Sequence, residues 1–265
     1  MKYLPKPILL SLTATLALYL AGCYTVPETG RSSLNVMPNS VLQQQASAAF
    51  QKMQEDAKIS KDKEKIQRVE RIGRRVLRAA GPSGDLPPPD DWKFVVFDND
   101  EMVNAFAMPG GKVGVYTGLM KLADNDDQLA VVIAHEVAHV SARHGNERVS
   151  QAVTVSGIGA GLNVALKDQD RETRQLVMAA YGLGAQFGAL LPYSRLHESE
   201  ADEIGLTYMA RAGYDPRAAP RFWQKMKSES EGKSPPEFLS THPSHDTRID
   251  KMQELMPRAL KIYRK

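Results

Sequence analysis

The sequence contains few of the features that stabilise small or extracellular folds. Its 265 residues include one cysteine and two tryptophans, and aromatic residues make up 7% of the chain. A single cysteine cannot form a disulfide within the chain, which excludes a disulfide-stapled fold. Basic and acidic residues are mixed along the sequence, with a net charge of +3. We therefore expect no nucleic-acid partner, because no single-sign block indicates a groove for one.

Long apolar runs and internal repeats are also missing. No run reaches the roughly 20 residues that a membrane-spanning helix needs. Hydrophobic residues make up 42% and charged residues 25% of the chain, which is ordinary for a globular protein. The length suits one large domain or two modest ones.

The N-terminus has the pattern of a secretory signal peptide. Lys2 and Lys6 lead into the short apolar segment "ILLSLTATLALYLAGC", which is too short and wrongly flanked for a stable membrane span. Its end, "LAGC", resembles the bacterial lipobox, in which the cysteine is lipidated and the chain is cleaved before it. Because Cys23 is the only cysteine, a lipid anchor explains it better than a buried thiol does. Tyr24 stands where an aspartate would indicate inner-membrane retention, which favours the outer membrane.

The expected organisation is a signal peptide over residues 1–22, a lipid-anchored tether over 23–40 and one domain over 41–265. The tether is rich in Pro, Ser, Asn and Gly and contains at most one short strand. Residues 41–80 are expected to be helical, since apolar residues recur there at spacings of three and four.

The rest of the chain predicts an α+β fold that is mostly helical, with a small sheet. Strands are expected over 92–98 and, around a Gly-Gly turn at 110–111, within 104–120. Asn125 and Gln128 form a capping box that begins a helix near residue 126. Further helices are expected over 195–212, over 216–230 with Asp215 as the cap, and from 246 to the end, with a bend at Pro257.

Residues 151–191 are apolar, rich in Gly and Ala, and split by "KDQDRETRQ". They predict a helical hairpin in which small residues permit close packing, rather than a membrane contact. Their position between the two halves of the site described next also makes them a candidate lid.

The segment "IAHEVAHVSARHG", residues 133–145, places two histidines four residues apart with a glutamate between them. On a helix, His135 and His139 share one face and can hold one Zn²⁺ ion. Glu136 lies one residue round the helix and is positioned to act as general base on a water molecule. Burying this glutamate in an apolar helix costs free energy unless it has a partner. The alternative is a surface helix with spare histidines.

A third ligand must come from elsewhere in the chain. The pattern HExxHxxGxxH is excluded because residue 142 is alanine, and His144 is expected to point elsewhere with a structural role. The segment "SRLHESEADEIG" offers Glu198, Glu200 and Glu203. Glu198 shares its helix face with small and apolar residues, whereas Glu200 shares a mixed surface. Glu198 is therefore the expected ligand, and Asp202, one turn on, can accept the second ring N–H of a ligating histidine.

Together these motifs resemble the family-48 zinc metallopeptidases, which include the HtpX, CAAX prenyl and BepA proteases. The resemblance rests on "HEVAH", on "ESEAD" followed by "STHPSHDTR", and on "NAFAMPGGKVGVYTGL" and "TGRSSLN". It covers roughly residues 28–250. A lipobox beside a stand-alone catalytic domain is most similar to the LoiP-type bacterial lipoproteins of this family.

The resemblance implies a zincin-type domain with one Zn²⁺ held by His135, His139 and Glu198, and with Glu136 as the catalytic base. It implies that His242 approaches the metal, either stabilising the oxyanion or filling the fourth coordination position. Arg248 is a further candidate for oxyanion support.

The expected function is an endopeptidase of the bacterial envelope, lipid-anchored on the periplasmic side, that degrades misfolded or stalled envelope proteins. Unfolded polypeptides would bind as a strand along residues 104–108. The alternatives are a chaperone-like factor for outer-membrane protein assembly with a latent zinc site, acting with other assembly factors, and a structural lipoprotein without metal.

Overall fold

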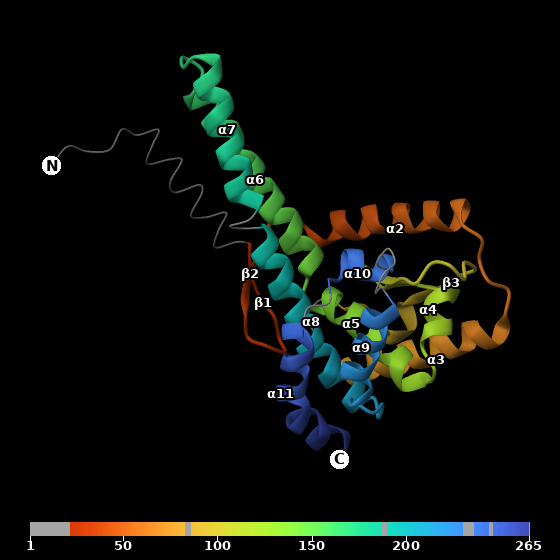
Figure 1. The fold of residues 1–265 in the computed structure, drawn as a ribbon. Helices are drawn as coiled ribbons and strands as arrows, with labels where there is room; N and C mark the ends of the chain where they lie inside the picture. The colour runs from red at the N-terminus through yellow and green to blue at the C-terminus, as the bar shows by residue number, and fades with distance from the viewer. Residues whose placement is uncertain (1–21, 83–85, 187–189, 230–235, 244–245, 265) are drawn as a thin grey trace.

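A single buried helix, α5 (Asp126–Ser141), lies at the centre of the domain (Figure 1). Every residue from Leu129 to His139 is buried. Asn125 is confirmed as the helix cap, because its side chain accepts a hydrogen bond from the Gln128 N–H at 3.0 Å. The Gln128 side chain reaches back to Asp124 N, at 2.9 Å, one residue before the expected partner. The computed structural model describes residues 22–82, 86–186, 190–229, 236–243 and 246–264. The predicted signal peptide lies outside these residues, apart from Gly22.

Helices surround α5, which confirms the expectation of a mostly helical α+β fold. The largest contact is with α8, and α3 and α9 also pack against α5. Among the described residues the other helices are α2 (Asn39–Asp56), α3 (Lys63–Ala80), η1 (Pro89–Asp91), α4 (Thr117–Leu122), α6 (His144–Ala165), α7 (Arg171–Ala185), α8 (Leu191–Arg211), α9 (Ala218–Glu229), α10 (Glu237–Thr241) and α11 (Asp246–Tyr263).

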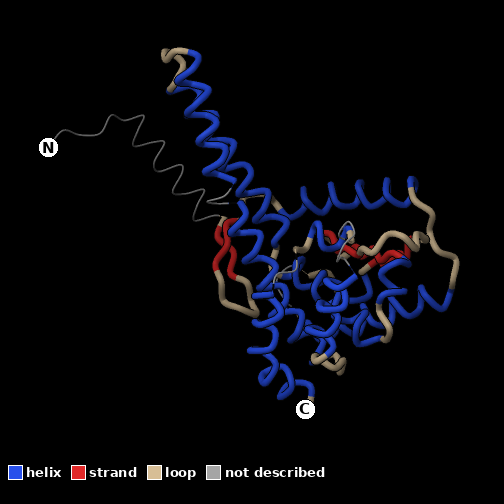
Figure 2. Tube along the Cα trace, viewed as in Figure 1, coloured by secondary structure: helices blue, strands red, loops and turns tan. Residues whose placement is uncertain are grey.

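A three-stranded sheet flanks α5 (Figure 2). It consists of β3 (Lys93–Phe97), β5 (Lys112–Tyr116) and β4 (Ala105–Met108), in that order. β5 runs parallel to β3 and antiparallel to β4. The predicted Gly-Gly turn joins β4 to β5, with φ of 78° at Gly110 and 75° at Gly111. β4 is therefore an edge strand, and α5 packs beside it.

Residues 41–80 were expected to be helical throughout, and the structure corrects this. The chain breaks between α2 and α3, where Ile59 pairs with Phe97 of β3. A new helix then begins because the Asp62 carboxylate accepts hydrogen bonds from Glu64 N and Lys65 N. The pairing with β3 outweighs the helical preference of this short segment.

Residues 23–40 were expected to be a tether with at most one short strand, but residues 23–34 form a two-stranded hairpin that packs on the domain. β1 (Cys23–Thr25) pairs with β2 (Ser32–Leu34). The Tyr24 hydroxyl donates to Ser141 O at 2.9 Å, at the end of α5. Asn146 of α6 bonds the Met37 backbone in both directions, at 2.8 and 3.3 Å. Cys23 is exposed at the start of the hairpin, and its lipidation stays a prediction.

The segment over 151–191 forms the predicted helical hairpin from α6 and α7 (Figure 1). The Tyr181 hydroxyl of α7 donates to Val155 O of α6 at 2.6 Å. The hairpin projects away from the body of the domain, so it does not cover the site as a lid. Within the described residues, no helix combines the length and apolarity required to cross a bilayer.

The C-terminal third differs in detail from expectation. α9 begins at Ala218, not 216, but Asp215 Oδ1 accepts a hydrogen bond from Arg217 N at 2.9 Å, as expected of a cap before this helix. The loop expected before residue 246 contains the short helix α10. Pro257 lies inside α11, as predicted.

Gly205 sets the distance between α8 and α5. A Cβ at this position would lie 3.2 Å from His135 N and 3.3 Å from Ala134 C. Since both atoms belong to backbone, α8 would have to shift to accept a larger residue.

We predict that Gly205→Val lowers the free energy of unfolding by about 1–3 kcal/mol, the usual cost of overpacking. It should also weaken metal binding, because α8 carries Glu198. Gly157→Val is the matched control, since a Cβ there meets nothing within 4 Å. Equal urea midpoints for the two variants would contradict this account of the helix contact.

Candidate metal centre

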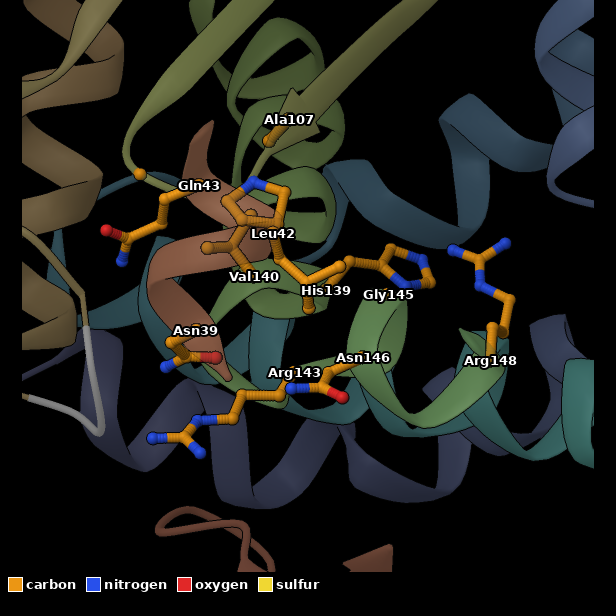
Figure 3. Close-up of a pocket in the computed structure, with 12 residues that line it drawn as sticks. Asn39, Leu42, Gln43, Ala107, His139, Val140, Arg143, Gly145, Asn146 and Arg148 are labelled. Atoms are coloured by element: carbon orange, nitrogen blue, oxygen red, sulfur yellow. The ribbon is translucent and has the colours of Figure 1, made fainter. Parts of the chain in front are cut away.

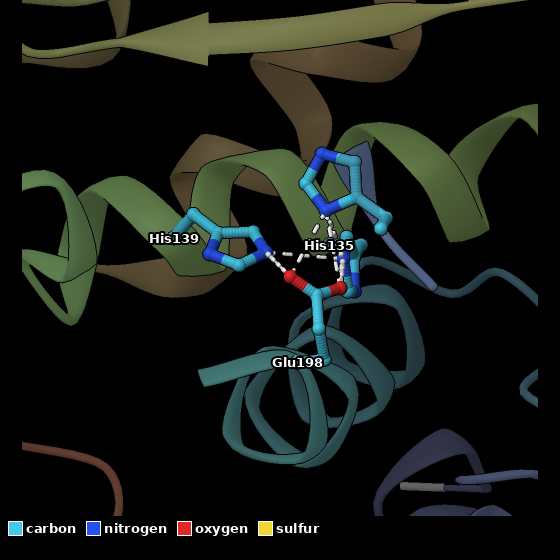
Figure 4. A group of neighbouring side chains, drawn as sticks. His135, His139 and Glu198 are labelled. Atoms are coloured by element: carbon cyan, nitrogen blue, oxygen red, sulfur yellow. Dashed lines mark hydrogen bonds and ion pairs between the residues drawn. The ribbon is translucent and has the colours of Figure 1, made fainter. Parts of the chain in front are cut away.

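His135 and His139 point from one face of α5 to a common point, as the i, i+4 spacing predicts (Figure 4). Both side chains are buried. Their Nε2 atoms lie 3.1 Å apart. Two neutral imidazoles this close need a shared proton or a cation between them.

Glu198 points from α8 toward the same two rings (Figure 4). Its Oε2 lies 3.2 Å from His135 Nε2, and its Oε1 lies 3.4 Å from His139 Nε2. The structure therefore brings together the two histidines and the glutamate that sequence reasoning selected.

His242 joins this group from the residue after α10. Its Nδ1 lies 3.1 Å from Glu198 Oε2 and 3.4 Å from His135 Nε2. Its ring stacks on Phe238, with centroids 4.6 Å apart. Phe238 N in turn donates to Val103 O at 3.1 Å, which attaches this loop beside the start of β4.

The four side chains fit a zinc site. Bonds of about 2.0–2.1 Å in a tetrahedron separate neighbouring ligand atoms by about 3.3 Å. The five separations given above, 3.1 to 3.4 Å, involve both oxygens of Glu198 and lie near that spacing. One ligand atom from each of the four residues lies within 4.8 Å of the others. Three imidazoles and one carboxylate are a usual donor set for zinc.

Glu136 lies between this group and the sheet edge. Its Oε2 accepts a hydrogen bond from Ala107 N of β4 at 3.2 Å. Its Oε1 lies 3.5 Å from His242 Nε2. Because Glu136 is one residue past His135 on the helix, its carboxylate points in a different direction from the two histidine rings. This is the position that a general base requires.

Asp202 lies on the far side of His135 from the ligand group. Its Oδ1 lies 3.0 Å from His135 Nδ1, which leaves the Nε2 lone pair for a metal. Arg248 binds the same carboxylate through Nε at 2.7 Å and Nη2 at 2.8 Å. Its Nη1 donates to Pro243 O at 2.9 Å. Arg248 therefore supports Asp202 directly, and its oxyanion role stays a prediction.

The electrostatics of the group favour a cation. Burial opposes a charge on His135, but Asp202 and Glu198 outweigh it and raise the pKa of His135 to about 9. Burial lowers the pKa of His139 well below its usual value. Burial also acts to raise the pKa of Glu198, yet the neighbouring histidines bring it far below the usual range. A protonated His135 thus supplies positive charge that a bound divalent ion could supply instead.

Two sequence predictions next to the centre need correction. His144 is outside the ligand group, as expected, but it does not point away from the centre: its Nδ1 lies 2.8 Å from His139 Nδ1. The extrapolation assumed one continuous helix, but α5 ends at Ser141 and Arg143 takes a left-handed φ of 55°. Glu200 does not lie on a mixed surface: it is buried, with Oε2 3.0 Å from His144 Nε2.

Sequence reasoning missed the residues that cover Glu200. Arg31 of the N-terminal hairpin donates to Glu200 Oε2 from Nε at 2.7 Å, and Thr29 also bonds this carboxylate. Glu147 and His197 belong to the same cluster, with His197 Nε2 2.9 Å from Glu147 Oε2. The segment "TGRSSLN" could be singled out only by its family resemblance. Nothing in its local pattern indicated that Thr29 and Arg31 bond to Glu200.

A pocket opens beside His139 and the edge of β4 (Figure 3). It has a volume of about 550 Å³, open to solvent. Ala107, Leu42 and Val140 give it an apolar wall, and Arg143, Asn146 and Arg148 line the remainder.

Comparison with known proteins agrees with this geometry. Residues 63–256 match peptidase family M48. The chain belongs to this family. It is 38% identical over 192 residues to the mitochondrial metalloendopeptidase OMA1 of Schizosaccharomyces pombe, a match covering 72% of this chain and 53% of that protein.

Two further relatives extend the comparison. The mitochondrial metalloendopeptidase OMA1 of Bos taurus is 32% identical, over 92% of this chain and 48% of that protein. The beta-barrel assembly-enhancing protease of Escherichia coli is 29% identical, over 85% of this chain and 46% of that protein. The chain thus spans about half the length of these relatives. Membership of family M48 confirms the resemblance drawn from the motifs. The two OMA1 relatives are named as mitochondrial proteins, which the motifs did not indicate.

We predict that Asp202→Asn weakens zinc binding by about 10–100-fold, because His135 loses its charged acceptor and Arg248 meets an amide N–H. Chelator competition measures this. Glu203→Gln is the matched control, since Glu203 pairs with Arg258 at the surface of the same helix. Unchanged affinity in Asp202→Asn would mean that Asp202 does not orient His135.

Proposed function

We propose that this M48 protein is a zinc-dependent endopeptidase of the bacterial cell envelope that degrades misfolded or stalled envelope proteins. The observation that carries the proposal is the buried group of His135, His139, Glu198 and His242, whose ligand atoms lie within 4.8 Å of one another. The carboxylate of Glu136 and a free sheet edge lie beside it.

The edge of β4 supplies the substrate site. Tyr116 N donates to Asn104 O, so the backbone N–H and C=O groups of every second residue, counted from Asn104, point toward β5. The backbone groups of Ala105 and Ala107 point outward, to the open edge of the sheet. An extended peptide that pairs with this edge would accept the hydrogen bond from Ala107 N–H, which Glu136 accepts in this structure. Backbone pairing gives affinity with little reading of sequence, which suits unfolded polypeptides as substrates. The pocket beside His139 would take a substrate side chain.

Glu136 performs the proton transfers. A bound zinc would polarise the scissile carbonyl and make a water nucleophilic near neutral pH. Once a substrate takes the Ala107 N–H, the Glu136 carboxylate is free to accept the proton of the attacking water. It then returns that proton to the leaving amine. Asp202 keeps His135 in one tautomer throughout, and Arg248 holds the Asp202 carboxylate in place.

The envelope setting is supported by the sequence and one relative. The lipobox-like end at Cys23 and Tyr24 after it favour a lipid anchor at the outer membrane, on the periplasmic side. One relative is named as a beta-barrel assembly-enhancing protease, which favours outer-membrane assembly factors as partners. The chaperone-like role remains the second candidate, because His242 sits among the expected ligands.

We predict that Glu136→Gln lowers casein hydrolysis by at least about 10²-fold, since the general base is lost. Bound zinc should stay at the wild-type level, because Glu136 is outside the ligand group. Zinc analysis of the same sample serves as the control. Equal casein hydrolysis by the variant and the wild type would favour the binding role over the endopeptidase.

We predict that His242→Ala raises casein hydrolysis and weakens zinc binding, because Nδ1 of His242 lies at ligand spacing from Glu198 and His135. Thr241→Ala, one residue earlier and exposed, is the matched control. A fall in kcat with unchanged zinc affinity would instead assign His242 to the oxyanion.

A further inference from the structure

A second buried cluster of ionisable residues lies behind His139, on the side away from the ligand group. It comprises Arg31, His144, Glu147, His197 and Glu200. All of these residues except Arg31 are buried. Two carboxylates and two imidazoles at this depth cost free energy unless they hydrogen-bond one another.

The hydrogen bonds of this cluster have one direction. Glu200 accepts from Arg31 and Thr29, so its carboxylate is an ionised acceptor. His144 must therefore donate from Nε2, which lies 3.0 Å from Glu200 Oε2. A neutral imidazole with its proton on Nε2 has a lone pair on Nδ1.

That lone pair decides the tautomer of His139. The Nδ1 atoms of His144 and His139 lie 2.8 Å apart, so one proton lies between them. Since His144 Nδ1 accepts, His139 Nδ1 donates, and the lone pair of His139 falls on Nε2. His139 Nε2 is the atom that faces Glu198 and His135. His144 thus orients the His139 ring and sets its tautomer, as the Asp202 carboxylate does for His135.

The N-terminal hairpin holds this arrangement in place through Arg31. The guanidinium donates to both oxygens of Glu147, at 2.9 and 2.7 Å, and to Glu200 at 2.7 Å. Glu147 accepts from His197, whose ring stacks on His144 with centroids 4.3 Å apart. The backbone fixes the Arg31 position, because Val26 N donates to Arg31 O at 2.8 Å.

We propose that Arg31, Glu200 and His144 are positioning residues of the metal centre, and that they hold His139 in the tautomer that binds metal. The N-terminal hairpin is then a working part of the centre. This inference rests on the proposed function only in that the centre binds zinc. It does not depend on peptide hydrolysis.

The test compares the full mature chain with His144→Phe and Arg31→Ala by chelator competition for zinc and by the absorption spectrum of the Co²⁺-substituted protein. Phenylalanine keeps the ring volume and removes both nitrogens. Each variant should bind zinc about 10–100-fold more weakly, with shifted cobalt bands. Arg31→Lys should recover part of the affinity, because it retains a cation. Arg258→Ala, which breaks a surface ion pair between α11 and Glu203 of α8, should behave as wild type.

Thermal melting of the metal-free proteins separates this role from packing alone. Lower melting temperatures with unchanged zinc affinity and cobalt spectra would overturn the proposal. If His144→Phe does not fold, Glu200→Gln keeps the side-chain volume, and the same two readouts decide. Wild-type protein that binds one zinc but leaves casein intact would refute the endopeptidase and leave this inference standing. Wild-type protein that binds no zinc would refute both.

Discussion

The close approach of two helices, α5 and α8, is the constraint on which the rest of the structure depends. Gly205 permits that approach, and it brings a carboxylate from one helix within 3.2–3.4 Å of two imidazoles from the other. Burying such groups is costly without compensation. Asp202 with Arg248 compensates His135, and His144 with Glu200 compensates His139. Each imidazole is thus held from behind, with its free nitrogen directed at one point.

The sequence predicted those parts of the site that follow from local helical geometry. The i, i+4 pair, the offset of Glu136 and the inward face of Glu198 needed only the periodicity of a helix. The contrast with a surface-facing Glu200 was wrong, because Glu200 is buried too. Prediction failed where the chain stopped being a continuous helix or where a distant segment covered a surface. The left-handed turn at Arg143 redirected His144, and Arg31 from a hairpin more than a hundred residues away buried Glu200. Neither contact leaves a local pattern to read.

The structure describes a centre whose reactive groups are engaged with one another. Glu136 accepts from the same Ala107 N–H that an incoming strand would use. His242 lies at ligand spacing, and its loop is attached at Val103 beside the same edge. A peptide adding to β4 would compete for both contacts. Under the proposed endopeptidase function, restraint of activity and binding of an extended substrate would involve the same backbone groups.

X-ray absorption at the zinc edge of the purified protein tests the central claim most directly. The account predicts one zinc per chain with four nitrogen or oxygen neighbours at about 2.0–2.1 Å and the outer-shell scattering of several imidazoles. A sulfur neighbour would contradict it, since Cys23 lies in the N-terminal hairpin and is exposed. A six-oxygen shell, or protein that holds no zinc, would contradict it equally.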